Sequence, residues 1–174
     1  MARIPYADPA RPEVRDLADR IVAQRGSLLH LYRMLMHSGP VVEGWLRYLT
    51  AIRYECDLPG DLRELAILRI AYLNGAPYEA EHHVKPALQE GVTQAQIDGV
   101  ADWSASDLYS DRQRAVLAYT DAMTRDIQVP DAVFAEVRRH FDERRIVELT
   151  ATIGAYNMVS RFLEALAIRN HDPV

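Results

Sequence analysis

Apolar side chains recur at every third or fourth position along most of the chain, which is the spacing of one face of an α-helix. No segment shows the alternation of apolar and polar residues between turn residues that predicts a β-strand. Glycine, proline and short polar clusters interrupt the helical pattern at intervals. The sequence therefore predicts an all-α protein, with helices close to residues 13–26, 27–38, 41–56, 61–73, 77–90, 93–100, 110–128, 130–140 and 142–169.

A helical hairpin lies at the centre of this pattern. Residues 62–73 are apolar on nearly all sides, which is typical of a buried helix rather than of a surface helix. Asn74 and Gly75 break this helix, and Pro77 can begin the next one because its fixed φ suits a first helical position. We therefore expect a helical bundle built around a central hairpin.

Helix-capping residues stand at the predicted starts of several helices. A side-chain oxygen at such a position accepts a hydrogen bond from one of the unpaired backbone amides of the first turn. Where a glutamate or glutamine follows three residues later, the two side chains form a capping box. The predicted caps are Ser27, Asp61 with Glu64, Thr93 with Gln96, Ser110 with Gln113, and Asp142. On this interpretation Glu64 is a capping residue.

The length of 174 residues suits one domain with a substantial core. Residues 1–12 contain three prolines and predict an extended N-terminal arm. We place the helical domain at residues 13–169 and a frayed C-terminal tail at residues 170–174.

Composition excludes several functional classes. The net charge of −5 and the lack of a dense basic run argue against nucleic-acid binding. No apolar run reaches the roughly 18 to 20 residues of a membrane span, so we expect a cytoplasmic protein. Cys56 is the only cysteine, which excludes an intramolecular disulfide, a two-cysteine redox pair and a thiolate metal cluster within one chain. We expect Cys56 to be a packed residue near a helix end.

The second helix of the hairpin carries the candidate chemistry. Glu79 lies three residues before His82 and four before His83, so all three can project from one helical face. His83 could act as a general acid or base, since imidazole titrates near neutral pH and a neighbouring carboxylate can orient it. Each neighbour also has a structural interpretation. Glu79 could complement the helix N-terminus, His82 could be a surface residue, and Tyr78 could be a core aromatic.

Metal binding is an alternative use of the same residues, because Glu64, Glu79, His82 and His83 offer oxygen and nitrogen ligands. A ferritin-like dimetal site would need a second Glu-x-x-His set on another helix, and the sequence has none. We therefore expect no metal. The chain also lacks a Gly-x-Ser-x-Gly elbow and a glycine-rich phosphate loop, which leaves hydrolase and nucleotide-binding functions without a motif.

Three stretches resemble the carboxymuconolactone decarboxylase and alkylhydroperoxidase-D-like family, and together they span most of residues 28–166. The stretches are residues 63–69 (RELAILR), residues 74–88 (NGAPYEAEHHVKPAL) and residues 146–163, from IVEL to YNMVSRFL. The resemblance implies an oligomeric all-α bundle with sites close to subunit interfaces and no organic cofactor. It also implies a homo-oligomer, a trimer or a hexamer.

The sequence departs from the redox members of that family at the paired cysteines. In those members a glutamate lies nineteen residues before the site histidine, and Glu64 and His83 keep this separation. The two cysteine positions hold Ala76 and Glu79 instead. The resemblance therefore implies the non-redox branch, which includes decarboxylases acting on carboxylated lactones, and no dithiol peroxidase reaction.

The expected function is that of a cofactor-independent lyase or isomerase acting on a small carboxylated or lactone-like molecule. His83 would move the proton while Glu64 and Glu79 orient it. Tyr78, His82 and Arg69 would contact the substrate, and Arg69 would hold a substrate carboxylate. The alternative is a non-catalytic binding or interaction protein that kept the fold and lost the redox cysteines.

Overall fold

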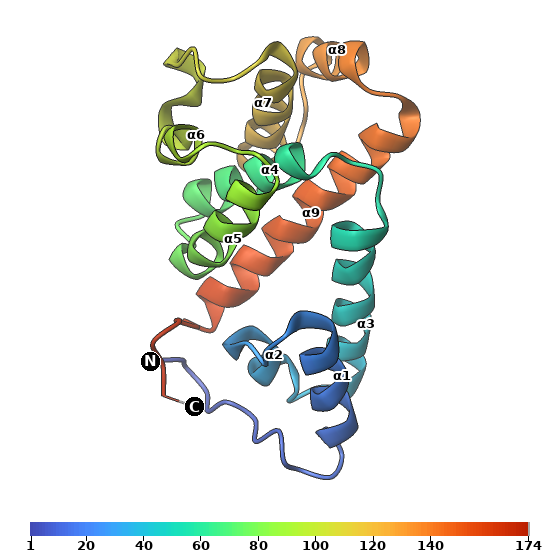
Figure 1. The fold of residues 1–174 in the computed structure, drawn as a ribbon, viewed down its shortest axis with the longest axis vertical. Helices are drawn as coiled ribbons and strands as arrows, with labels where there is room; N and C mark the ends of the chain where they lie inside the picture. Colours follow the sequence, from blue (N-terminus) through green and yellow to red (C-terminus); the bar gives the residue numbers. More distant parts are fainter. Residues whose placement is uncertain (174) are drawn as a thin grey trace. The chain divides into compact units, whose positions relative to one another are not determined.

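The computed structural model describes residues 1–173, and these residues form helices without any β-strand, which confirms the all-α prediction (Figure 1). The elements, in chain order, are α1 (Arg15–Arg25), α2 (His30–Leu35), α3 (Gly39–Thr50), the π-helix η1 (Ala51–Glu55), α4 (Gly60–Leu73), α5 (Pro77–Gln89), α6 (Gln94–Asp98), the 3₁₀-helix η2 (Val100–Ala105), α7 (Asp111–Arg125), α8 (Asp131–His140) and α9 (Glu143–Ala165). None of the described helices is both long enough and apolar enough to cross a membrane.

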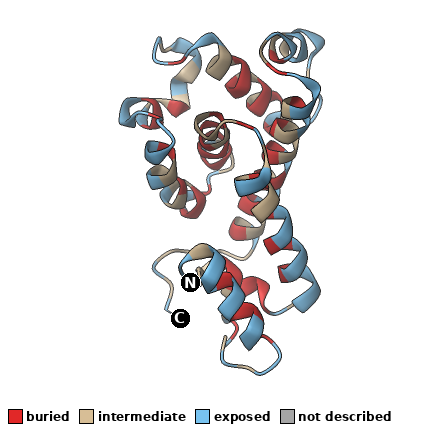
Figure 2. Ribbon diagram, turned by 45° about the vertical axis from the view of Figure 1, so that its right-hand side comes forward, coloured by how far each residue is buried: buried red, intermediate tan, exposed pale blue. Residues whose placement is uncertain are grey.

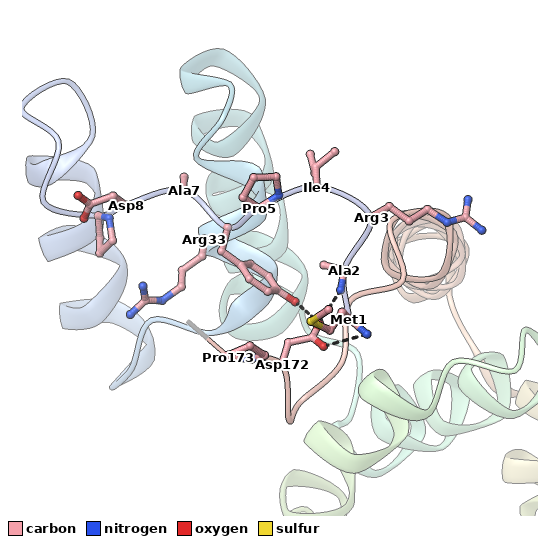
Figure 3. A pocket seen from close by; sticks show the side chains of 12 residues that line it. Met1, Ala2, Arg3, Ile4, Pro5, Ala7, Asp8, Arg33, Asp172 and Pro173 are labelled. Atoms are coloured by element: carbon pink, nitrogen blue, oxygen red, sulfur yellow. Dashed lines mark hydrogen bonds and ion pairs between the residues drawn. The ribbon is translucent and has the colours of Figure 1, made fainter.

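The described chain divides into two compact units, one formed by residues 1–55 with residues 163–173, and the other by residues 56–162. In the first unit the N-terminal arm is held by backbone and side-chain hydrogen bonds. The amide of Ala7 donates to the carbonyl of Arg33 over 3.3 Å, and the Tyr6 hydroxyl donates to Asp172 over 2.7 Å. The arm and the chain end line a cavity of about 560 Å³ (Figure 3). The single domain expected over residues 13–169 stays a prediction.

The second unit is organised around α4, which packs against α5 and against α7. Nine of the fourteen residues of α4 are buried, and they lie on all sides of the helix, as its apolar sequence predicts (Figure 2). The hairpin turn also follows the prediction. Gly75 has φ +60°, a value that glycine adopts without steric cost, and the next amide, that of Ala76, donates to the carbonyl of Ala71 over 2.8 Å. Pro77 is the first residue of α5.

The helix caps confirm some predictions and correct others. Both side chains of the predicted boxes Thr93–Gln96 and Ser110–Gln113 make their hydrogen bonds, and Asp142 accepts from the amide of Arg145. The prediction for Ser27 was wrong, since α2 begins at His30 and its cap position, Leu29, has no side-chain hydrogen bond.

The capping box predicted for Asp61 and Glu64 was also wrong. Helix α4 already begins at Gly60, so Asp61 lies inside the first turn, and the cap position Pro59 has no side-chain hydrogen bond. Glu64 is fully buried and bonds to other side chains instead.

The segment 102–108, expected to be a loop, begins with the last turn of η2. The helix expected over residues 41–56 changes to a π-helix at Ala51.

Candidate functional site

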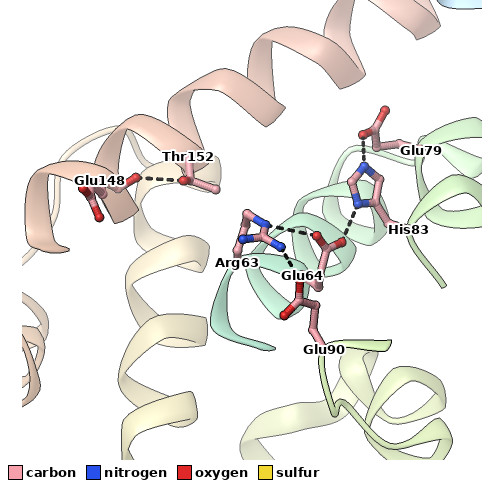
Figure 4. A network of polar contacts seen from close by, with 7 residues as sticks. All are labelled: Arg63, Glu64, Glu79, His83, Glu90, Glu148 and Thr152. Carbon is pink, nitrogen blue, oxygen red and sulfur yellow. Dashed lines mark hydrogen bonds and ion pairs between the residues drawn. The ribbon is translucent and has the colours of Figure 1, made fainter. Parts of the chain in front are cut away.

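The α4–α5 hairpin brings Glu64 and His83 into direct contact, although they are nineteen residues apart. Nδ1 of His83 lies 2.6 Å from Oε2 of Glu64, and Nε2 of His83 lies 3.0 Å from Oε1 of Glu79 (Figure 4). All three side chains are buried, with 0%, 3% and 4% of Glu64, His83 and Glu79 exposed. Both ring nitrogens are therefore held by carboxylates away from water.

The pKa of His83 is raised above its ordinary value of 6.5. Burial by itself lowers the pKa of an imidazole, because it disfavours the charged form. The hydrogen bonds and negative charges of Glu64 and Glu79 act in the opposite direction and together outweigh burial. The folded protein thus favours the imidazolium form of His83, in which both nitrogens donate.

Glu64 has a second charged partner, Arg63. The Nε of Arg63 donates to Oε1 of Glu64 over 3.2 Å, and Nη2 of the same guanidinium donates to Oε1 of Glu90 over 2.9 Å (Figure 4). Sequence reasoning missed both Arg63 and Glu90 as members of the site. The only local signal was that Arg63 stands next to Glu64 in the first stretch that carries the family resemblance.

Aromatic rings surround this group. The ring of Tyr156, on α9, meets the His83 ring edge to face, with centroids 5.1 Å apart. Tyr156 belongs to the third family-like stretch, but its position against His83 was not predicted. Tyr78 is buried, and the centroid of its ring lies 4.6 Å from that of the half-buried His82 ring. Substrate contacts of Tyr78 and His82 remain predictions.

Arg69 is bonded to groups of the protein itself, and its expected contact with a substrate carboxylate stays a prediction. Its Nε and Nη2 donate to the two carboxylate oxygens of Asp121 over 2.6 and 2.7 Å, and its Nη1 donates to the carbonyls of Val100 and Ala101. The Trp103 indole also donates to Asp121. These bonds use four of the five N–H groups of the guanidinium, so a substrate carboxylate could bind Arg69 in a bidentate manner only by displacing one of these partners. Arg69 instead ties η2 to α4 and α7.

An apolar pocket of about 470 Å³ opens on another side of the hairpin. Its walls come from α4, the hairpin turn, the N-terminal half of α5, and the segment around α6 and η2. The lining residues are Leu68, Ala71, Tyr72, Gly75, Ala76, Pro77, Ala80, Val84, Ile97 and Val100. Among residues 1–173, no three His, Cys, Asp or Glu side chains are grouped as a metal site requires.

Two proteins of known sequence align with most of this region. The chain is 30% identical to the uncharacterized protein YdfG of Bacillus subtilis over 109 residues, which cover 62% of this chain and 74% of YdfG. It is 31% identical to the uncharacterized protein YnjA of Escherichia coli over 126 residues, which cover 72% of this chain and 66% of YnjA.

Solved structures share the fold. A protein of unknown function from Agrobacterium tumefaciens, ATU0492, superimposes with a TM-score of 0.73 at 26% identity, covering 80% of this chain and 94% of that one. An uncharacterized peroxidase-related protein with an alkylhydroperoxidase AhpD core, from Ralstonia eutropha, gives a TM-score of 0.83 at 19% identity over 98% of this chain and 93% of that one. The debrominase Bmp8, in complex with 2,3,4-tribromopyrrole, gives a TM-score of 0.82 at 17% identity. The match covers 98% of this chain and 94% of Bmp8. At these two lower identities the likeness concerns the fold alone.

The profile of the carboxymuconolactone decarboxylase family matches residues 40–122, a range that contains Glu64, Glu79 and His83. Together with the relatives and the shared fold, this match confirms the family predicted from the sequence. The chain belongs to the carboxymuconolactone decarboxylase family.

Proposed function

We propose that this protein is a cofactor-independent acid–base catalyst, a lyase or isomerase that moves a proton on a small lactone-like or otherwise enolisable molecule. The observation that carries the proposal is the buried imidazole of His83 held between the carboxylates of Glu64 and Glu79. Buried ionisable groups with shifted pKa values are typical of catalytic sites.

The two ring nitrogens of His83 have different roles in this proposal. Nδ1 faces the fully buried Glu64, which fixes the ring plane and stabilises the imidazolium. Nε2 faces Glu79, so it is the nitrogen from which a proton reaches the substrate once Glu79 turns aside. The Nε2 proton is delivered to the carbon of a substrate enolate, whose electron pair forms the new C–H bond. The neutral imidazole can take a proton from carbon in the reverse direction.

The charges near His83 favour a neutral substrate over a carboxylated one. Glu64, Glu79 and Glu90 bring three carboxylates to the network, against the guanidinium of Arg63 and the imidazolium of His83. Arg69, the cation expected to hold a substrate carboxylate, is paired with Asp121. The proposal therefore keeps the lactone-like or enolisable carbonyl class and does not include a salt bridge between a substrate carboxylate and Arg69.

The test is exchange of substrate carbon-bound hydrogen for deuterium in heavy water, followed by NMR across a panel of neutral lactones, enolisable ketones and their carboxylated counterparts. We expect exchange or turnover with a neutral member, and a loss of about 10²-fold or more in His83→Gln and in Glu79→Gln. Glu81→Gln, an exposed carboxylate on the same helix, is the matched control. Wild-type rates in His83→Gln would refute the proposal.

A second candidate is a binding protein without catalysis. It is favoured by the small exposure of His83 and Glu79, 3% and 4%, and by the apolar pocket beside the hairpin. The pocket volume of about 470 Å³ lies within the range of roughly 300–1,000 Å³ common for small-molecule sites. Calorimetric binding of a panel member without exchange or turnover, unaffected by His83→Gln, would select this candidate.

A further inference from the structure

We infer that Arg63 is a positioning residue that keeps the shared proton of the site on His83 by holding Glu64 in its carboxylate form. The catalytic meaning of this inference rests on the proposed function. The location of the proton is a separate property that can be measured without any substrate.

The contacts of Glu64 motivate the inference. Its side chain is fully buried, and both carboxylate oxygens contact charged groups, Oε2 with Nδ1 of His83 at 2.6 Å and Oε1 with Nε of Arg63 at 3.2 Å (Figure 4). Arg63 is 11% exposed. Its charge therefore acts on Glu64 with little screening by solvent.

A proton between a buried carboxylate and an imidazole can reside on either group. In a poorly solvated site the neutral pair of carboxylic acid and imidazole competes with the ion pair, because burial disfavours both charges. A guanidinium bonded to the far oxygen stabilises the carboxylate and cannot release a proton itself. Arg63 therefore shifts the balance toward the ion pair, with the proton on Nδ1 of His83.

Arg63 is itself held in place from the other side. Glu90, in the residues that follow α5, accepts from its Nη2 over 2.9 Å. Glu90 in turn packs against the backbone at Gly60, the first residue of α4, where an added Cβ would overlap the Glu90 carboxylate. An alanine at position 60 would therefore require the Glu90 carboxylate to shift.

The groups that face His83 come from three helices. Arg63 and Glu64 lie on α4, Glu79 lies on α5, and the uncharged ring of Tyr156 lies on α9. Of these, Arg63 is the cation that contacts a carboxylate partner of His83. Removing its charge is therefore the change that distinguishes an ion pair from a neutral pair at Glu64 and His83.

The test uses the full chain with isotope-labelled histidine, and NMR correlations of the ring nitrogens recorded at about pH 6, below the ordinary histidine pKa. In the wild type we expect both nitrogens of His83 to be protonated. In Arg63→Gln, a neutral side chain that can still donate a hydrogen bond, we expect Nδ1 to shift to the position of an unprotonated nitrogen while Nε2 stays protonated. Arg63→Met is a second neutral replacement if glutamine prevents folding.

Two further variants exclude a merely structural effect. Arg63→Lys should restore the protonated Nδ1 signal, because it restores the charge. Lys85→Gln, which removes an exposed cation from α5, should leave the His83 signals unchanged. A protonated Nδ1 in Arg63→Gln or Arg63→Met, or a neutral His83 in the wild type, would overturn the inference. A wild type without turnover would overturn only the proposed function.

Discussion

His83 experiences two opposing effects of its surroundings on its charge. Burial disfavours the imidazolium, while Glu64 and Glu79 favour it, and the outcome is a raised pKa. The same carboxylate, Glu64, was also expected to cap a helix. The structure shows it bonded to His83 and Arg63, so its removal affects the charge of His83 rather than the start of α4.

Glu64→Gln tests this assignment. Glutamine has no negative charge to stabilise the imidazolium, so burial should then lower the pKa of His83, and NMR titration should detect the fall. We expect turnover to decrease by about 10²-fold or more and stability by about 1–3 kcal/mol. The Glu81→Gln variant, at an exposed position, should change none of these three quantities: the pKa of His83, turnover and stability. An unchanged His83 titration in Glu64→Gln would contradict the assignment.

The raised pKa of His83 also predicts a pH dependence of stability. A group whose pKa is higher in the folded than in the unfolded state stabilises the fold fully below its unfolded pKa, here about 6.5, and this stabilisation is lost as the pH rises through the folded pKa. Denaturant unfolding of wild type and His83→Gln should therefore show that the stability advantage of the wild type is greatest below about pH 6.5 and shrinks toward alkaline pH. A stability advantage of the wild type that grows with pH would show that folding lowers the pKa of His83 instead of raising it.

At the scale of elements, two glycines differ in the backbone conformation that their positions require: Gly75 in the hairpin turn and Gly154 in α9. Gly75 needs a positive φ of +60° to end α4, and no heavy atom lies within 4 Å of a Cβ built there. Gly154 lies within α9, is exposed, and is equally free of close atoms. An alanine at either position would meet no obstacle, so only the backbone conformation distinguishes the two positions.

We expect Gly75→Ala to destabilise the protein by about 1–2 kcal/mol, the cost of the left-handed conformation for an L-residue. Gly154→Ala should stabilise it by about 0.5–1 kcal/mol, because alanine loses less backbone entropy in a helix. Urea unfolding of the two single variants measures both changes. If both variants changed the free energy of unfolding in the same direction, backbone conformation would not explain the effect of alanine at these two positions.

At the scale of the whole molecule, the exposed face of α9 is partly apolar. Val147 is 67% exposed and Met158 is 39% exposed, and the two residues are eleven positions apart, three turns along the helix. A contiguous exposed apolar patch can mark an association surface. We propose that this face contacts a second copy of the chain in the trimer or hexamer that the family resemblance implies.

Light scattering should therefore give a mass of three or six times 19.8 kDa. Val147→Glu should lower that mass, because it places a charge in the proposed contact. Ile127→Glu, at a position that is 85% exposed, is the control and should leave the mass unchanged. A wild-type mass of one chain, or a mass that Val147→Glu does not alter, would contradict the proposed contact.

The sequence by itself determined the features that depend on neighbouring residues. The helical spacing predicted the all-α fold, Asn74-Gly75-Ala76-Pro77 predicted the hairpin turn, and the spacing of Thr93 and Gln96 predicted a capping box. These predictions succeeded because helix periodicity, turns and caps involve atoms a few residues apart. The spacing of Glu64 and His83 was recognised through the family resemblance.

Only the tertiary structure decided which partner each charged side chain binds. Arg69 pairs with Asp121, 52 residues away, and Glu64 binds His83 and Arg63 rather than the start of its own helix. Tyr156 reaches His83 from α9. The physical reason is that a buried charge must find an opposite charge or a donor within hydrogen-bond distance. Which group lies at that distance depends on how the helices pack, and local sequence rules do not contain that information.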